Sequence, residues 1–526
     1  MRQRDTFRWI QLGALAIVGI GLAWGNALMS IGQLLLVGNT IASGIARRDL
    51  GARARLAFAH PGLLIFLSFF LLHVIGLLWT ENMEWGLDLC RILAPVVVLP
   101  VVLCMAGPLE KDESRAILML FAAGTIASTI ACLVLRPGGA ALTDFRSLSV
   151  FISHIRLALL LCVSAAVLLW YWPVKQPWRV LHVVATAWAV YFIAQLESLQ
   201  GLLFQSLILL FFLWKRIVRW PGRWKWVTGS IVLIAVGLMG ANTMRWVKEH
   251  YRSQHVDLDH LAVYSAGGEM YYHDRQRPQW ENGHPVWINV ADKELERCWE
   301  RRSAIPFDGD DGKGHPLRFT LVRYMASMGL VKDSTGMRTM SDEGVRRMSY
   351  RDRRCAELGL PRVARGRRGA VRERVEEILF ELDEYRSTGD PSGYSIAMRL
   401  EFWKAGLAIA KREWLHGVGT GDTQEAFNAE YERRGSLLQP HWRLRAHNEY
   451  LTLWISFGAF GALWCLLAWI LPVWRSRAYR DPLFIAWAIA FAISCLTDDT
   501  PETQAGATFF GFFYALFVFG SHREQG

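Results

Sequence analysis

The feature that most constrains this chain is a series of apolar runs long enough to cross a membrane as helices. The hydrocarbon core of a bilayer is about 30 Å thick, so a spanning α-helix needs about 20 predominantly apolar residues. Twelve such runs recur, at approximately residues 10–28, 30–46, 61–79, 90–106, 115–135, 154–172, 179–196, 198–214, 226–243, 447–470, 482–497 and 504–520. The chain is therefore predicted to be an all-α polytopic membrane protein with about 12 transmembrane helices.

Composition excludes several other classes of protein. Hydrophobic residues make up 52% of the 526 positions and charged residues only 20%, which argues against a disordered or fibrous chain. Six of the eight cysteines lie within the apolar runs, unlike those of a disulfide-stapled secreted module. The first run lacks a small-x-small cleavage site, so it is expected to remain as an anchor rather than to be removed as a signal peptide.

The distribution of Lys and Arg supports both the number of spans and their orientation. With the N-terminus placed inside, the short loops assigned to the inner face hold 20 Lys and Arg residues, against two, Arg136 and Arg146, in those assigned to the outer face. Two further outer loops, residues 81–84 and 498–502, carry only acidic charge. Because a missed span would scramble this alternation, the positive-inside rule predicts that both termini are cytoplasmic.

One long polar insertion interrupts the spans. The predicted organisation is residues 1–243 with transmembrane helices 1 to 9, residues 244–446 as a mainly helical domain on the outer side, and residues 447–526 with helices 10 to 12. The insertion holds 34 Lys plus Arg and 31 Asp plus Glu, so it is nearly neutral. The net charge of +11 therefore reflects membrane topology rather than a nucleic-acid partner.

The insertion offers few signals of metal or disulfide chemistry. Its acidic pairs, at residues 257–259 and 308–311, fit loop carboxylates better than a metal site for a nucleotide sugar, which is absent on the outer side. No metal and no cofactor is predicted. Cys298 and Cys355 are the only cysteines in the insertion, and an oxidising compartment permits a disulfide between them, which the sequence leaves open.

Three elements place ionisable residues at the outer ends of spans, where a charge is costly unless it is used or reaches the interface. They are Ser153-His154-Ile155-Arg156, the segment around Arg399, and Arg445-Ala446-His447-Asn448-Glu449-Tyr450-Leu451. Between the last two lies His416-Gly417-Val418-Gly419-Thr420-Gly421-Asp422. Its glycines allow either a tight turn or a close approach of the backbone to a ligand.

The order of these elements resembles a known family. Arg-x-x-x-Trp from Arg399, then Gly-Val-Gly-Thr-Gly-Asp, then Arg-Ala-His-Asn-x-Tyr-Leu, then a span with Phe-Gly-Ala-Phe-Gly is similar to the O-antigen ligase and polymerase superfamily of bacterial envelope glycosyltransferases. The resemblance covers roughly residues 394–470, and the twelve-span layout and the His-x-Arg element support it more loosely. Residues 245–390 match no motif of the family.

The resemblance implies a membrane-embedded, metal-independent glycosyltransferase whose donor is a glycan on polyprenyl diphosphate, such as undecaprenyl diphosphate. The residues suit that chemistry. Displacing a diphosphate from an anomeric carbon needs cations for the developing negative charge, which Arg156 and Arg399 can supply. The attacking hydroxyl needs a base near neutrality, and histidine is the natural choice. His447, Arg399 and Arg156 are thus the predicted catalytic residues.

Further residues of the same motifs are predicted to bind substrate: Arg445, Asn448, Tyr450, Gly417 and Gly419. Some structural interpretations remain open beside these roles. Arg156 suits snorkelling at a helix end nearly as well as ligand binding. Arg443 and Arg445 either guide phosphates to the site or terminate a loop.

Two members of the superfamily would use this apparatus differently. A ligase passes the glycan to the lipid A core in lipopolysaccharide biosynthesis, whereas a polymerase passes it to another lipid-linked repeat. We favour the ligase, acting at the periplasmic face of the bacterial inner membrane, and protein O-oligosaccharyltransferases share much of the pattern. A transporter of envelope lipids or polysaccharide is a more distant alternative, because no internal repeat is evident. Sugar specificity, oligomeric state and the role of residues 245–390 are left open.

Overall fold

The computed structural model describes most of the chain. The described residues are 6–135, 148–173, 175–196, 198–218, 222–252, 260–275, 279–281, 284–303, 305–309, 316–340 and 389–520, with isolated positions between 345 and 386. Cys355 lies outside them, and so does the pairing proposed for Cys298. The Arg-rich stretch from residue 362 to residue 374, whose sequence predicts an amphipathic helix with the acidic residues that follow, also lies mostly outside them.

The chain is an all-α membrane protein, and helices occupy every predicted span. Before the insertion they are α1 Thr6–Trp24, α2 Asn26–Ala46, α3 Leu50–Phe58, α4 Pro61–Gly76, η1 Leu77–Trp79, α5 Met83–Ile92, α6 Ala94–Ala106, α7 Lys111–Val134, α8 His154–Trp170, α9 Gln176–Gln195, α10 Leu199–Ile217 and α11 Gly222–Arg252. The later ones are α19 Ser395–Arg412, α20 Thr423–Arg433, η4 Pro440–Trp442, α21 Glu449–Ser476, η5 Ala478–Arg480, α22 Pro482–Ser494, η6 Thr500–Glu502, α23 Gln504–Tyr514 and the π-helical turn η7 Ala515–Phe519.

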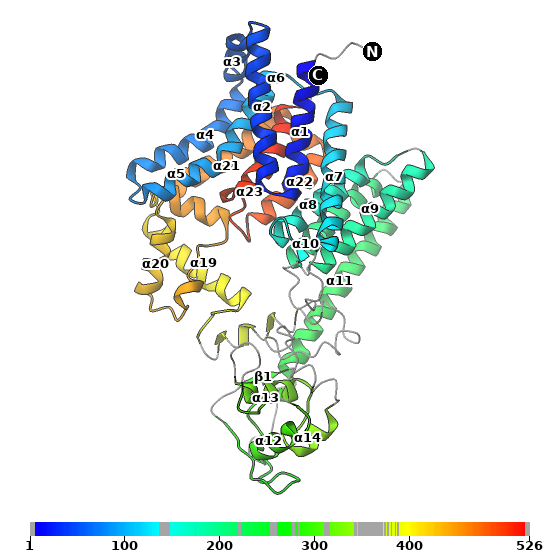
Figure 1. The fold of residues 1–526 in the computed structure, drawn as a ribbon, viewed down its shortest axis with the longest axis vertical. Coiled ribbons are helices and arrows are strands. Elements are labelled where there is room, and N and C mark those ends of the chain that lie inside the picture. The colour runs from blue at the N-terminus through cyan, green and yellow to red at the C-terminus, as the bar shows by residue number, and fades with distance from the viewer. Residues whose placement is uncertain are drawn as a thin grey trace.

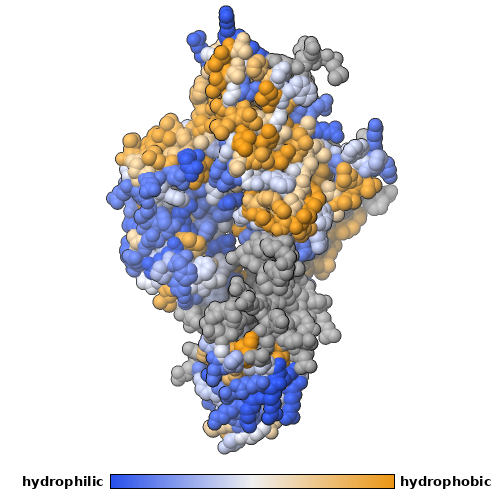
Figure 2. Space-filling model, in the orientation of Figure 1, coloured by the Kyte–Doolittle hydropathy of each residue, from blue (hydrophilic) through white to orange (hydrophobic). Residues whose placement is uncertain are grey.

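Length and hydropathy divide these helices into two groups. Seven helical segments within the described residues are long and apolar enough to cross a membrane, and four shorter apolar helices accompany them at His154–Trp170, Gln200–Lys215, Pro482–Ser494 and Gln504–Phe519. The ninth predicted span lies within the 31-residue α11. In Figure 2 a hydrophobic surface covers the helical bundle, while the region of α19 and α20 is hydrophilic.

The insertion lies at one end of the bundle. In Figure 1 the beginning of α1 lies at the top, whereas α12 Asp292–Glu300, α13 Leu317–Ser327 and α14 Ser334–Thr339 lie at the bottom. The helix α11 extends from the bundle toward this distal part. The start of α1 and the helices α12 to α14 therefore lie at opposite ends of the molecule.

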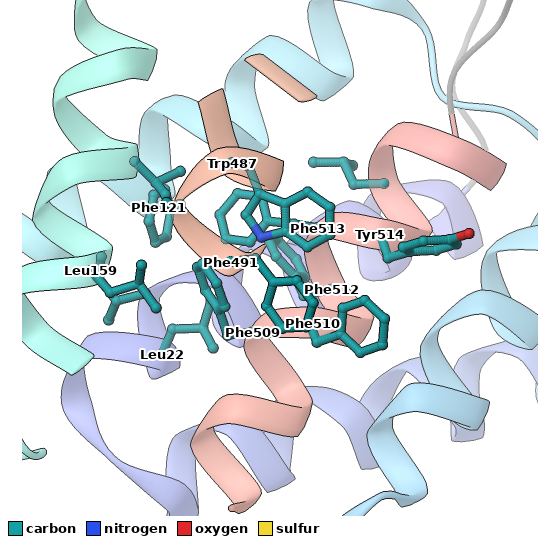
Figure 3. Packing of buried hydrophobic residues seen from close by; sticks show 14 of the residues in the cluster. Leu22, Phe121, Leu159, Trp487, Phe491, Phe509, Phe510, Phe512, Phe513 and Tyr514 are labelled. Carbon is teal, nitrogen blue, oxygen red and sulfur yellow. The ribbon is translucent and has the colours of Figure 1, made fainter. Parts of the chain in front are cut away.

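The last two membrane helices pack through an aromatic core. Trp487 and Phe491 of α22 lie against Phe510 of α23, and the rings of Phe491 and Phe510 are stacked at 4.5 Å (Figure 3). Aromatic burial contributes strongly to packing, so this contact fixes the two helices against each other. The short loop of residues 495–503, which joins them, is consequently held at both ends.

Residues 260–340 contain a small unit with its own core, which we call the distal unit. Trp299 of α12, Leu321 of α13 and Met337 of α14 are buried together. A two-stranded antiparallel ribbon, β1 Trp280–Glu281 with β2 His284–Pro285, contacts α13. The unit therefore buries apolar side chains independently of the membrane helices.

Candidate functional site

The long helix α21 is broken at Gly458, and the glycine-rich turn fills the break. Gly458 has φ 68° and ψ −179°, which are not helical. The carbonyls of Ile455 and Ser456 accept hydrogen bonds from Val418 N–H at 2.8 Å and Gly419 N–H at 3.0 Å. Backbone groups freed inside an apolar helix must find partners within the protein. Residues 414–420 supply those partners.

This packing accounts for the two glycines that were predicted to bind substrate. Gly417 has φ +71°, and a Cβ atom there would lie 2.4 Å from the backbone of Ser456. At Gly419, with φ +98°, a Cβ atom would lie 2.6 Å from the hydroxyl of Thr80. Gly417 is thus needed for a contact between backbones, and Gly419 for the close approach of Thr80. Through these contacts the turn packs α21 against the end of α4.

His447 lies just before α21 with an unusual backbone. Its φ of 46° is left-handed, a conformation that costs about 1–3 kcal/mol for a residue other than glycine. Trp403 of α19 donates its indole N–H to the carbonyl of Ala446 at 3.1 Å. The carboxylate of Asp499 accepts from the N–H of Asn448 at 3.1 Å. The peptides on both sides of His447 are therefore held.

The imidazole of His447 faces a carboxylate that also interacts with Arg156. His447 Nδ1 lies 3.4 Å from Asp498 Oδ1, and about a third of the His447 side chain is exposed. Asp498 lies in the loop after α22, and Arg156 is in the first turn of α8, which packs against α22. Burial alone would raise the pKa of Asp498. The hydrogen bond with His447 and the charges of His447 and Arg156 lower it below its ordinary value.

Arg156 is partly exposed in the first turn of α8. Its Nε atom is buried and has no hydrogen-bond partner within the described residues. Arg156 is close enough to Asp498 for its charge to lower the pKa of that carboxyl, and its Nε atom has donor capacity for a further anion.

Arg399 comes to the same region through α19. Its Nη1 atom donates to the hydroxyl of Ser395 at 2.6 Å in the same helix. One turn further along, the ring of Phe402 lies 5.8 Å from that of His447, centroid to centroid, and Trp403 binds Ala446. Residues three and four apart share one face of a helix. Arg399 therefore lies on the face of α19 that carries these contacts to the His447 segment.

Arg445 is occupied by carboxylates of the loop of residues 495–503. It forms a buried ion pair with Glu502, and Asp499 is 4.0 Å away. Its guanidinium also lies over the ring of Trp85, 5.6 Å from the ring centroid. Burial works against the charged form of Arg445, but Glu502 and Asp499 outweigh it and raise the pKa of the guanidinium. Of the two interpretations of Arg445, this geometry favours the structural one.

The other predicted binding residues have defined structural partners. Asn448 caps α21, with its side-chain oxygen accepting from Leu451 N–H at 3.1 Å. The hydroxyl of Tyr450 donates to the carbonyl of Ala492 at 2.8 Å. Arg443 donates to the carbonyl of Leu438 at 3.2 Å, within its own loop. These contacts fix the entry into α21.

Sequence reasoning missed the acidic partners of the motif. The loop with Asp498, Asp499 and Glu502 was interpreted only as a negatively charged outer loop. Glu449, at the start of α21, is 1% exposed, and its Oε2 atom has no hydrogen-bond partner among the described residues. The available signal was an outer loop with three carboxylates and no cation of its own, which needs a basic partner elsewhere. Within the described residues, no group of His, Cys, Asp and Glu is arranged to hold a metal ion.

A comparison with known families identifies the segment that carries this geometry. Residues 363–466 match the family model for O-antigen ligase. The resemblance predicted from the motifs is thereby confirmed over this segment, which contains α19, α20 and the first part of α21. No curated protein matches the chain. Members of the matched family are membrane glycosyltransferase-like enzymes with glycan and lipid-linked substrates.

The match ends within α21 and does not extend to the last two membrane helices. Asp498 and Glu502 follow it by more than 30 residues in the chain, and Arg156 precedes it by about 200. The structure nevertheless brings these residues to the His447 segment. The candidate site is therefore assembled from the matched segment and from elements on both sides of it.

Proposed function

We propose that this protein is an O-antigen ligase-like glycosyltransferase. It moves a glycan from a polyprenyl-diphosphate carrier to the lipid A core, at the periplasmic face of the bacterial inner membrane. The observation that carries the proposal is the group formed by His447, Asp498 and Arg156, with Arg399 on the adjacent face of α19. The family match supports the class of substrate.

In the proposed reaction, an acceptor hydroxyl attacks the anomeric carbon of the donor sugar. The new C–O bond forms as the bond to the diphosphate oxygen breaks, and the electron pair leaves with the diphosphate. His447 takes the proton of the hydroxyl, and Asp498 stabilises the imidazolium that results. Arg156 and Arg399 interact with the negative charge that develops on the diphosphate. These cations make a metal unnecessary in this scheme.

The proposal includes a membrane topology. Twelve helices cross the membrane, counting the shorter apolar helices and α11, and both termini are cytoplasmic. Residues 244–446 are periplasmic, so the site opens on the side where a flipped lipid-linked glycan is presented. Support comes from the start of α1 lying opposite the distal unit (Figure 1) and from the alternation of Lys and Arg between loops. Cysteine accessibility labelling at loop positions of intact cells tests this topology.

The function is tested with the full-length protein in proteoliposomes. The donor is a defined glycan on undecaprenyl diphosphate, and each vesicle preparation receives one acceptor: lipid A core, a second lipid-linked repeat, or an acceptor protein. Transfer to lipid A core that is lost in His447→Ala is the expected result. Transfer only to lipid-linked repeats would make the protein a polymerase, and transfer to protein an oligosaccharyltransferase. Donor movement across the bilayer without any transfer would favour a transporter.

A further inference from the structure

The left-handed backbone conformation of His447 needs contacts that maintain it. We infer that Trp403 is a positioning residue, which sets the rotation of the His447 backbone and so aims the imidazole at the acceptor hydroxyl. This inference rests on the proposed function of His447 as the base. It concerns a residue that hydrogen-bonds to the peptide bond before His447 and acts through that bond.

The hydrogen bond of Trp403 fixes the first of the two peptide planes at His447. Its indole N–H donates to the carbonyl of Ala446 at 3.1 Å, and Ala446 is completely buried. That carbonyl belongs to the peptide bond that precedes His447. The angle φ of His447 is the rotation about its N–Cα bond, relative to this peptide plane. Holding the Ala446 carbonyl in place therefore restrains φ at 46°.

The second peptide plane is fixed from the opposite side. Asp499 Oδ1 accepts from Asn448 N–H at 3.1 Å and from the Thr452 hydroxyl at 2.8 Å. The Asn448 N–H belongs to the peptide bond that follows His447, so this contact restrains ψ. Trp403 and Asp499 thus hold the two planes from different elements. A strained backbone persists only where its surroundings fix it in this way.

Trp403 also links His447 to Arg399. The two side chains are four residues apart in α19, so they share one face of the helix. The proposed base and the proposed phosphate-binding cation are therefore tied through one hydrogen bond between α19 and the segment before α21. Loss of that bond should disturb the direction of the imidazole while Arg399 keeps its place in α19.

The chain offers a matched control in Trp454. Trp454 is also partly buried, belongs to α21 and packs against the same apolar cluster as Trp403. Its indole Nε1 is buried and has no hydrogen-bond partner among the described residues. Trp403→Phe and Trp454→Phe therefore make the same change in ring size. They differ in whether a hydrogen bond to the backbone of the site is lost.

The test measures transfer by full-length variants in proteoliposomes, with undecaprenyl-diphosphate-linked glycan and lipid A core. We expect Trp403→Phe to lower kcat about tenfold, as for one lost hydrogen bond, with the KM for the donor unchanged. Trp454→Phe should leave both constants at the wild-type values. Equal kcat in the two variants, beside an active wild type and an inactive His447→Ala, would overturn the role of Trp403 and leave the proposed function standing.

A second measurement is independent of activity. Diethyl pyrocarbonate modifies accessible imidazoles, and mass spectrometry reads the rate at His447 alone. A changed rate in Trp403→Phe but not in Trp454→Phe supports the restraint, even for a protein that transfers no glycan. An unchanged rate in both variants, with His441 as an internal reference, contradicts it.

Discussion

The segment around His447 and the distal unit both bury carboxylates, but they treat them differently. In the distal unit, Glu294 accepts hydrogen bonds from the Ser265 hydroxyl and from Ser334 N–H. Asp333 caps α14 and accepts from the Tyr271 hydroxyl at 2.6 Å. At the candidate site, Glu449 has a buried oxygen with no hydrogen-bond partner in the described part of the chain, and Glu502 shares Arg445 with Asp499.

The backbones differ in the same way. The distal unit places Asn289 in the left-handed region, which asparagine tolerates comparatively well. The candidate site places His447 there, at a position where the side chain is partly exposed and faces Asp498. A buried charge alone is therefore no sign of function. A left-handed backbone at a partly exposed imidazole that faces a carboxylate is the distinguishing feature.

The largest expected effect comes from removing the base. His447→Ala should lower transfer at least about 100-fold, because a positioned base contributes on that scale. Transfer to lipid A core in proteoliposomes measures it. The matched control is His441→Ala, an exposed histidine six residues earlier in η4. Equal losses of transfer in the two variants would mean that His447 contributes no more than an exposed histidine outside the site.

The next largest effect on transfer is expected from removing Arg156. Arg156→Ala is expected to lower transfer about 100-fold, since one donor to developing negative charge has that weight. Arg156→Lys should recover part of it, because the charge returns without the planar fork. Arg91→Ala, at an exposed arginine of α5 paired with Asp88, should leave the rate unchanged. An active Arg156→Ala would return Arg156 to a helix-end role.

Asp498→Asn is expected to lower kcat about tenfold, because the charge-assisted hydrogen bond to His447 is weakened. The pKa of Asp498 is lowered in the folded protein, so its ionised form stabilises the site above the unfolded-state pKa. That contribution is lost as pH falls through the folded value. The kcat of the wild type should therefore fall toward that of Asp498→Asn as the pH is lowered. A constant ratio between the two profiles would contradict the pairing.

The smallest effect on transfer is expected in the distal unit. Burial opposes ionisation of Glu294, but hydrogen bonds from Ser265 and Ser334 outweigh it and lower its pKa to about 2. The stabilisation is present above the unfolded pKa near 4.5 and is lost as pH falls toward 2. Glu294→Gln should speed hydrogen exchange of α12 near neutral pH and leave transfer unchanged. A large loss of transfer would connect the distal unit to the chemistry.

Much of the fold follows from hydropathy because a bilayer imposes one length on every span. Each predicted span corresponds to a helix, with boundaries that differ by several residues. The break of α21 at Gly458 was not predicted, and neither was the packing of residues 414–420 into that break. The glycines of that turn allowed two interpretations, and only the position of Ser456 beside Gly417 favours packing.

The sequence by itself determined the helices and the motifs around Arg399 and His447, because periodicity and local spacing are properties of neighbouring residues. Only the tertiary structure decided which distant groups meet. Asp498 is 51 residues from His447 and Arg156 is nearly 300 residues away, yet the packing of α8 on α22 brings both to one place. Electrostatic interaction depends on distance in space, and distance along the chain does not reveal it.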